Sequence, residues 1–284
     1  MKKYLSLVTF SHTIFAMPFA IIGFFLAVTT TNHSFEWIKL LLMLLCMIFA
    51  RNSAMAFNRY LDRDIDLKNP RTQQRDIPSG RISPVSALTF TIVNCVLFII
   101  TASFINSLCF YLSPLALLVV LGYSVTKRFT ALCHLVLGLG LSLAPIGAYL
   151  VVTGSFDWIP LFFSFAVLCW VSGFDIIYAL QDEDFDLKEN LHSIPAYLGK
   201  VNALRFSTFL HILSAVFVVM PVFFIHVSLL YYAGIIFFCS MLIYQHILVK
   251  PNDLSKVNFA FMTTNGIASV VFAIFFLLDR LLLR

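Results

Sequence analysis

The stretch Lys39–Asp66, which reads KLLLMLLCMIFARNSAMAFNRYLDRDID, decides the fold of this protein. Its first part is mostly apolar, and its last nine residues contain three aspartates. A helix that crosses a bilayer needs about 20 apolar residues. In hydrocarbon, a single segment can pair its own backbone polar groups only as a helix. The stretch therefore predicts a transmembrane helix that ends in an acidic segment at one membrane surface.

Long apolar runs also fill the rest of the chain. Hydrophobic residues make up 60% of it and charged residues 12%, against about 25% charged in ordinary soluble domains. We therefore expect an all-α polytopic membrane protein, one domain over residues 1–284, with nine transmembrane helices around a central cavity. The predicted segments are 7–29, 39–60, 85–104, 107–125, 131–152, 159–180, 203–224, 228–249 and 258–280.

The basic residues lie mainly between these segments, and the formal net charge is +5. At such positions they indicate topology or phosphate binding, and no nucleic-acid partner is expected. The loops 61–84 and 181–202 are richer in Lys and Arg than the connections that alternate with them. Basic loops stay in the cytoplasm, so both loops are expected on that side, and Lys2 and Lys3 place the N-terminus inside. Arg280 and Arg284 argue against this orientation but are outnumbered.

The first acidic motif closes the stretch quoted above. Asn58, Asp62 and Asp66 are spaced i, i+4, i+8, which places them on one face of an α-helix. Two carboxylates about 6 Å apart repel by roughly 3 kcal/mol at an effective dielectric constant of about 20. The negative end of the helix dipole adds to this cost. A cation is therefore needed beside the motif.

The second acidic motif repeats the spacing in Tyr178, Asp182 and Asp186, and Asp175 lies seven residues before Asp182 on the same face. A single DxxxD pattern is usually a solvated helix end. Here seven of the 11 aspartates of the chain fall in the two motif stretches, and both stretches are expected on one membrane face. This pairing favours a shared site.

Carboxylate-rich sites favour hard cations such as Mg²⁺. Mg²⁺ binds few carboxylates and takes its remaining ligands from water and substrate phosphates. We therefore expect Mg²⁺ as the cofactor, holding a diphosphate between the motifs. The predicted metal ligands are Asp62, Asp66, Asp182 and Asp186, with Asn58 and Asp175 in support.

These residues resemble the motifs of the UbiA superfamily of intramembrane prenyltransferases. The first motif is similar to the family's NxxxDxxxD, and the second to its DxxxD with a Tyr one turn earlier. The resemblance implies nine helices, a polyprenyl diphosphate held through Mg²⁺, a tunnel for the prenyl chain and transfer of that chain to an aromatic ring. One departure is that Ser11–Pro18 lacks the Arg that many members carry before this Pro.

Within the family, the chain resembles the quinone-pathway branch in the inner or plasma membrane of bacteria. The resemblance implies an aromatic acid as acceptor, 4-hydroxybenzoate, in respiratory quinone biosynthesis. A dihydroxynaphthoate of menaquinone biosynthesis is the alternative. Haem, chlorophyllide or a glycerol phosphate are further acceptors in the same superfamily. The expected catalytic residues are Asp62, Asp66, Asp182, Asp186 and Tyr178.

Several basic residues are candidates for substrate binding. Arg71 and Lys127 are expected to contact the diphosphate, Arg as a two-pronged donor and Lys as a point charge. Arg51 lies inside a transmembrane segment, where a charge costs about 2.5–3.5 kcal/mol, so it is expected to pair with the acceptor carboxylate or with a motif aspartate. The predicted substrate-binding residues are Arg51, Asn58, Arg71, Lys127 and Asp175.

Aromatic side chains near the motifs are candidates for shielding an allylic carbocation, because aromatic faces stabilise cations without trapping them. Tyr178 is the strongest of these, followed by Phe57, Tyr123 and Phe174. His192 is either an ordinary loop histidine or part of a lid or proton acceptor. A transporter is the competing class, since intramembrane acids mark ion paths. Transporters, however, bind near the bilayer midplane, whereas these acids lie at one face.

Overall fold

The computed structural model describes residues 15–283, and this part of the chain is helical without β-strands. The long helices are α2 (Met17–Thr30), α3 (Trp37–Leu61), α5 (Pro84–Ser103), α6 (Ser107–Thr126), α7 (Cys133–Thr153), α8 (Ile159–Ala179), α10 (Ile194–Val219), α11 (Leu229–Leu248) and α13 (Asn265–Leu282). The short ones are α4 (Arg63–Lys68), η2 (Leu180–Asp182), α9 (Glu183–Lys188), η3 (Met220–Phe223), α12 (Val257–Phe259) and the π-helical turn η4 (Ala260–Thr264).

Within the described residues, eight helices are long and apolar enough to cross a membrane. The first predicted segment, 7–29, corresponds to α2, whose described part has 14 residues; residues 7–14 lie outside the described residues. The expected all-α polytopic membrane architecture is confirmed. The boundary of α10 differs from the predicted start at 203. A short first stretch begins at Ile194, where Ser193 caps it by accepting from the Ala196 N–H, and the chain then kinks at Gly199, whose φ of 73° is not helical.

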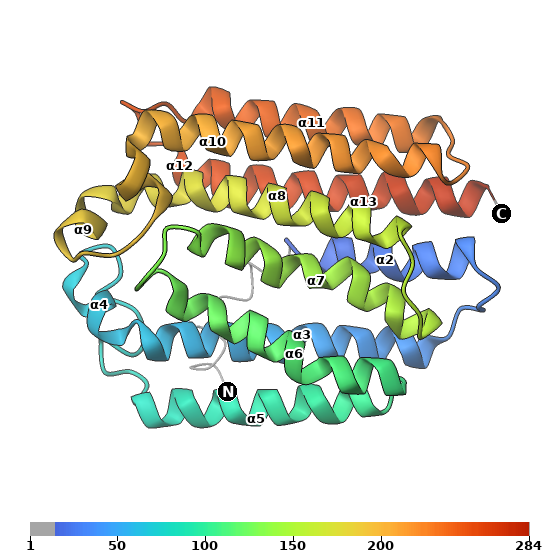
Figure 1. Ribbon diagram of the computed structural model, residues 1–284, viewed down its shortest axis with the longest axis horizontal. Coiled ribbons are helices and arrows are strands. Elements are labelled where there is room, and N and C mark those ends of the chain that lie inside the picture. The colour runs from blue at the N-terminus through green and yellow to red at the C-terminus, as the bar shows by residue number, and fades with distance from the viewer. Residues whose placement is uncertain (1–14, 284) are drawn as a thin grey trace.

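The long helices run roughly side by side along the molecule (Figure 1), and the short helices α4 and α9 lie together at one end of the bundle. We call this the acidic end, since α4 and α9 carry the second half of each acidic motif. The connections 31–36, 104–106, 154–158 and 224–228 lie at the opposite end (Figure 1). The two long polar loops therefore share one end, as the sequence predicts.

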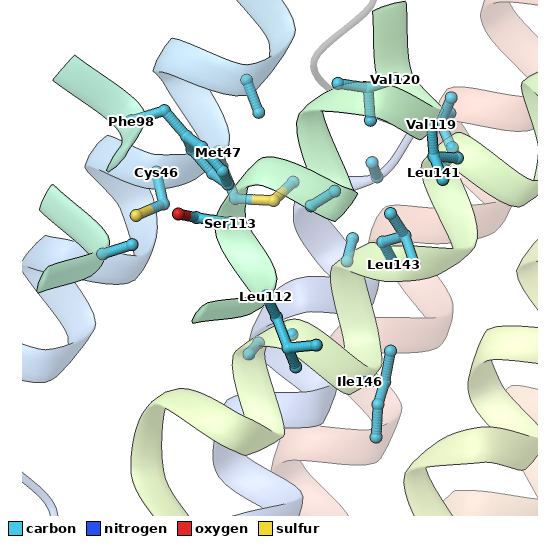
Figure 2. A pocket seen from close by; sticks show the side chains of 18 of the residues that line it. Cys46, Met47, Phe98, Leu112, Ser113, Val119, Val120, Leu141, Leu143 and Ile146 are labelled. Atoms are coloured by element: carbon cyan, nitrogen blue, oxygen red, sulfur yellow. The ribbon is translucent and has the colours of Figure 1, made fainter. Parts of the chain in front are cut away.

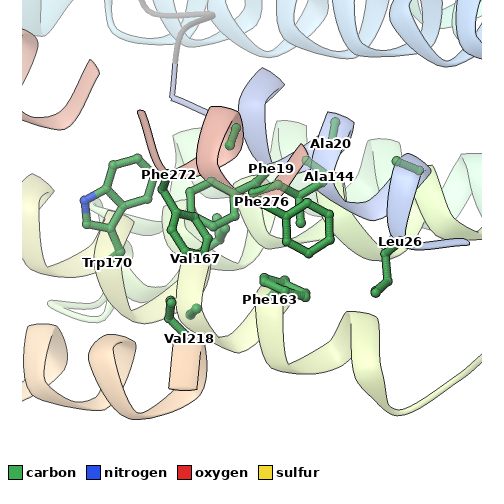
Figure 3. Close-up of a cluster of buried hydrophobic side chains, with 14 of the residues drawn as sticks. Phe19, Ala20, Leu26, Ala144, Phe163, Val167, Trp170, Val218, Phe272 and Phe276 are labelled. Carbon is green, nitrogen blue, oxygen red and sulfur yellow. The ribbon is translucent and has the colours of Figure 1, made fainter. Parts of the chain in front are cut away.

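Aromatic side chains from α2, α8 and α13 form the core of one half of the bundle (Figure 3). Phe19 packs against Trp170 and Phe272 with ring centroids 5.4 and 5.9 Å apart. Phe163 meets Phe276 edge-to-face at 5.6 Å. Tilted and edge-to-face pairs are the favourable geometries for aromatic rings, so this cluster fixes α8, the helix that leads into the second motif.

Hydrogen bonds between helices also fix α8. The Ser207 and Ser214 hydroxyls of α10 donate to the Gly173 and Ala166 carbonyls at 2.7 and 2.9 Å. Small hydroxyl-bearing residues of this kind join membrane helices closely. The Trp170 indole N–H donates to Asn265 at 2.8 Å. The second acidic motif is therefore held by a helix that is anchored on two sides.

Candidate active site

The first motif spans a break between two helices. Helix α3 ends at Leu61, Asp62 has φ −85° and ψ 2°, and α4 begins at Arg63. This backbone conformation is the bridge region, which active-site residues often adopt. The expectation of a single unbroken helical face is therefore wrong in this detail. The break turns both Asp62 and Asp66 inward, and both are buried.

The second motif breaks at the equivalent position. Helix α8 ends at Ala179, the turn η2 covers Leu180–Asp182, and Asp182 has φ −102° and ψ 1° before α9 begins. The six-residue helices that follow read RDIDLK in α4 and EDFDLK in α9. The weak internal repeat in the sequence thus corresponds to a repeated structure, in which the same break presents the same pair of aspartates.

Basic side chains neutralise the first motif. Lys127 lies 2.6 Å from Asp62, and Arg128 is 3.6 Å from its other oxygen. The Asn58 amide donates to Asp62 at 3.1 Å, and Arg75 donates to Asp66 at 2.7 Å. Burial raises the pKa of the Asp62 carboxyl above its ordinary value, and the Lys127 ammonium opposes that shift. The cation that the sequence requires is thus supplied in part by the protein itself.

The Arg71 side chain binds two residues of the second motif. Its guanidinium forks onto Asp182, with Nε 3.0 Å from Oδ1 and a second, very short contact between Nη2 and Oδ2. Its Nη1 donates to the Tyr178 hydroxyl at 2.7 Å, and the Asn69 amide donates to Asp182 at 3.1 Å. Arg71 and Asn69 follow the first motif in sequence, so they join the two motifs directly.

Further contacts hold the two motif loops together. Lys68 and Glu189 form an ion pair at 2.6 Å, and the His192 backbone N–H donates to the Lys127 carbonyl at 2.8 Å. Asp186 lies within electrostatic range of both Asp182 and Lys127. Residues 58–66 and 178–186 therefore form one site at the acidic end, as a shared ligand requires.

Asp175 points to a different partner. Its carboxylate lies 2.7 Å from Nδ1 of His134, which is buried at the start of α7. Nε2 of His134 accepts from the Ile194 N–H at 3.3 Å, so Nδ1 carries the proton and donates to Asp175. This histidine ties together α7, α8 and α10 just below the second motif, a role for which the sequence carries no signal.

The donor atoms of the first motif fit a hard divalent cation. Among the described residues, Oδ1 of Asp62 and Oδ2 of Asp66 are buried and have no hydrogen-bond partner, and buried carboxylate oxygens of this kind are ligands that Mg²⁺ prefers. In the second motif both oxygens of Asp182 already accept hydrogen bonds, so a metal there would compete with Arg71. Within residues 15–283, no group of three or more His, Cys, Asp or Glu side chains is arranged closely enough to hold a metal ion by itself.

An apolar cavity of about 470 Å³ lies among α3, α5, α6 and α7 (Figure 2). Cys109 and Tyr123 both line it from α6, fourteen residues or about 21 Å apart along the helix. Arg51, Tyr123 and Ser113 contribute polar groups to a wall that is otherwise apolar. Tyr123 lies within electrostatic range of Asp62. The cavity therefore extends from beside the first motif toward the opposite end of the bundle.

An aromatic pair lies beside the second motif. The Tyr178 ring packs against Phe261 in a tilted arrangement with centroids 4.2 Å apart, and the Arg71 guanidinium lies 5.1 Å from the centroid of the Tyr178 ring. Phe174 meets Phe261 edge-to-face at 5.4 Å. Phe261 belongs to the π-helical turn η4, a feature frequent at functional sites. Sequence reasoning missed Phe261 because it is 83 residues beyond Tyr178 in the chain.

Two further residues near the motifs take less central places. Arg81 pairs with Asp76 at 2.8 Å, in the loop between α4 and α5. Phe57 lies half-buried on α3. The part of Ser11–Pro18 before residue 15, where the departure from the family pattern was noted, lies outside the described residues.

The described chain is thus a bundle of helices long and apolar enough to cross a membrane, with paired acidic motifs beside an apolar cavity. The chain belongs to the UbiA prenyltransferase family, which it matches over residues 16–273. It is thus an integral membrane prenyltransferase.

Proteins of known sequence and solved structures are similar to this chain over most of its length. The 4-hydroxybenzoate octaprenyltransferases of Tolumonas auensis and Aliivibrio fischeri are 28% and 29% identical, over 83% and 84% of this chain and 82% of each relative. The apo structure of a UbiA homologue from Aeropyrum pernix K1 has a TM-score of 0.81 and 27% identity, covering 95% of this chain and 97% of that one. A UbiA homologue from Archaeoglobus fulgidus, bound to GPP and Mg²⁺, has a TM-score of 0.75 and 21% identity, covering 98% and 99%.

Proposed function

We propose that this protein transfers a polyprenyl group from a polyprenyl diphosphate to 4-hydroxybenzoate, with Mg²⁺, in respiratory quinone biosynthesis. The observation that carries the proposal is the joining of both acidic motifs into one site beside an apolar cavity. The names of the relatives from Tolumonas auensis and Aliivibrio fischeri support the acceptor. The Archaeoglobus fulgidus homologue, bound to GPP and Mg²⁺, supports the donor and the metal.

The motif aspartates would hold the metal, and Arg71 and Lys127 would hold the diphosphate. When bound, Mg²⁺ supplies Lewis-acid stabilisation of the charge on the leaving diphosphate. Arg71 and Lys127 now pair with Asp182 and Asp62. With substrate and metal bound, both basic side chains would be able to turn from carboxylate to phosphate oxygens, which match the guanidinium fork equally well. The predicted metal ligands are Asp62, Asp66, Asp182 and Asp186, with Asn58 and Asp175 in support; the Asp175 carboxylate here lies 2.7 Å from Nδ1 of His134.

The reaction breaks one bond and forms another. The allylic C–O bond breaks, and diphosphate leaves with the electron pair. A π electron pair of the acceptor ring forms the new C–C bond, and the ring then loses a proton and becomes aromatic again. The products are the prenylated acid, diphosphate and one proton. Water must be kept from the carbocation, and the adjoining Tyr178 and Phe261 rings offer an aromatic face for it.

The acceptor carboxylate needs a basic partner of its own. Arg51 lines the cavity from α3 together with Tyr123, and a charged group at this depth of a membrane helix is a functional feature by default. In the proposed function, Arg51 binds the carboxylate of the acceptor at the cavity wall. Asp175, which is hydrogen-bonded to His134, lies on α8 just before the second motif and completes the predicted substrate-binding set.

The test uses purified protein in lipid vesicles with octaprenyl diphosphate, Mg²⁺, and 4-hydroxybenzoate in competition with a dihydroxynaphthoate. The mass of the product identifies the acceptor. We expect octaprenyl-4-hydroxybenzoate, and no product when a chelator removes the metal or when Asp182 is replaced by Ala. Prenylated dihydroxynaphthoate as the main product would move the protein to menaquinone synthesis. Cation flux without any product would point to the transporter reading.

A further inference from the structure

Gly147 leaves open space in the wall of the apolar cavity. It lines the cavity from α7, and a Cβ atom added to it would meet no heavy atom within 4 Å. The side of α7 that faces α2 is closed by contrast, because a Cβ added to Gly23 would lie 2.1 Å from the Pro145 carbonyl oxygen. Helix α7 is thus fixed on one side, and the missing side chain of Gly147 leaves free volume on the other.

Gly147 lies in the far part of the cavity. It follows Cys133, where α7 begins near the acidic end, by fourteen residues, or about 21 Å along the helix. Leu150, Val151 and Phe156 line the cavity beyond it. An extended chain advances roughly 3.5 Å for every three bonds. On this scale a geranyl chain anchored at the acidic end spans roughly 8 Å and stops short of Gly147, whereas an octaprenyl chain spans roughly 36 Å and passes it.

We propose that Gly147 determines the length of the prenyl chain that the protein accepts. The inference rests on the proposed function, since it takes the diphosphate to lie at the acidic end and its tail in the cavity. Side chains on the cavity wall set how far an apolar chain can extend, because packed interiors tolerate little overlap. With Gly at 147 the passage stays open, and a larger residue there closes it to long chains.

The test compares geranyl and octaprenyl diphosphate as donors for Gly147→Ala and Gly147→Leu. Overlap of a bulky side chain with a ligand costs about 1–3 kcal/mol, or about 5–150-fold in binding. We expect Gly147→Leu to lower the ratio of kcat/KM for octaprenyl over geranyl diphosphate at least about tenfold, and Gly147→Ala to lower it less. Gly122→Leu is the matched control. An added Cβ there also meets nothing within 4 Å, but Gly122 is not among the cavity-lining residues, so the ratio should stay at the wild-type value.

Ala116→Leu, which narrows the cavity from α6, repeats the test if Gly147→Leu fails to insert, and the same loss of the ratio is expected. An unchanged ratio in the inserted variant, or an equal change of both donors, overturns the role of Gly147. In that case transfer by the wild type still stands, and so does the proposed function. If the wild type transfers neither donor, the proposed function fails, and this inference fails with it.

Discussion

Asp62 is the most tightly held carboxylate of the first motif. It is 2% exposed and contacts Lys127, Arg128 and Asn58, while Oδ1 keeps no hydrogen-bond partner among the described residues. Asp62→Asn preserves the shape but removes the charge. The variant therefore loses a proposed metal ligand and leaves the Lys127 and Arg128 cations beside each other. Since even outer-shell partners of a metal cost about 10–100-fold when removed, we expect loss of activity on the order of 100-fold or more, measured as product mass over time.

Asp64→Asn is the matched control for that change. Asp64 lies two residues away in the same motif, but its side chain is 80% exposed and its only ion pair with a described residue is a 3.6 Å contact to Arg63. Exposed pairs of this kind contribute little, so activity should stay close to the wild-type rate. Equal losses in both variants would show that the loop responds to any loss of charge and that Asp62 has no special role.

The Arg71–Tyr178 contact gives a second prediction for single residues. Tyr178→Phe keeps the ring contact with Phe261 and removes the hydroxyl that accepts from Arg71 at 2.7 Å. One such hydrogen bond contributes about 1 kcal/mol, so kcat/KM should fall roughly fivefold. Arg71→Lys loses the fork as well and should cost more. In the double variant the two effects should not add, because the variants share one interaction; strict additivity of the logarithms would contradict the coupling.

The helices of this protein follow from composition, but their breaks do not. Long apolar runs can satisfy their backbone in a membrane only as helices, so the spans of α3, α5, α6, α7 and α11 agree closely with the predicted segments. The sequence around the interruptions at Asp62 and Asp182 contains no Gly or Pro that would predict a helix break. They depend on contacts with Lys127 and Arg71, which come from loops elsewhere in the chain, and a local pattern contains no information about those contacts.

The packing of α2 against α7 gives a prediction at the scale of elements. Gly23→Ala would put a Cβ 2.1 Å from the Pro145 carbonyl oxygen, and a backbone atom cannot move aside alone, so the two helices must separate. Overpacking of this kind costs about 1–3 kcal/mol, and each kcal/mol lowers Tm by about 2–4 °C in a chain of this size. The measurement is the apparent Tm of the detergent-solubilised protein.

Gly122→Ala tests whether that effect comes from the contact or from any change of Gly in a helix. An added Cβ at Gly122 meets nothing within 4 Å, and Ala favours a helix by about 1 kcal/mol over Gly. Its Tm should therefore equal or exceed that of the wild type. A Gly23→Ala protein as stable as Gly122→Ala would show that α2 and α7 do not pack as closely as described.

At the scale of the whole molecule, the site was predictable where its parts repeat and unpredictable where they meet by folding alone. The two DxxxD motifs are visible because their spacing occurs twice. Phe261 and His134 stand alone in their segments, and only the packing of the bundle brings them to Tyr178 and Asp175. A single aromatic or histidine in an apolar run has no pattern that distinguishes it from core residues, which is why both were missed.

The distribution of charge over the ends of the bundle bears on orientation. The loop 61–84 at the acidic end carries five Lys or Arg, and the connection 154–158 at the opposite end carries none. Arg280 lies toward the opposite end but is 6% exposed and bonded to Asp279 at 2.5 Å. Its charge is therefore neutralised and does not act as a topology signal. Arg280 therefore no longer argues for the reverse orientation.

This distribution predicts that the acidic end faces the cytoplasm, because clusters of Lys and Arg flanking membrane segments are retained there. In a variant whose six cysteines are replaced by Ala, Ser79→Cys and Ser155→Cys place single thiols at exposed positions of the two ends. A thiol reagent that cannot cross membranes should label Ser155→Cys in intact bacteria and Ser79→Cys only after the cells are broken. The reverse result would put both acidic motifs on the outer surface, away from the cytoplasmic supply of prenyl diphosphate that the proposed reaction needs.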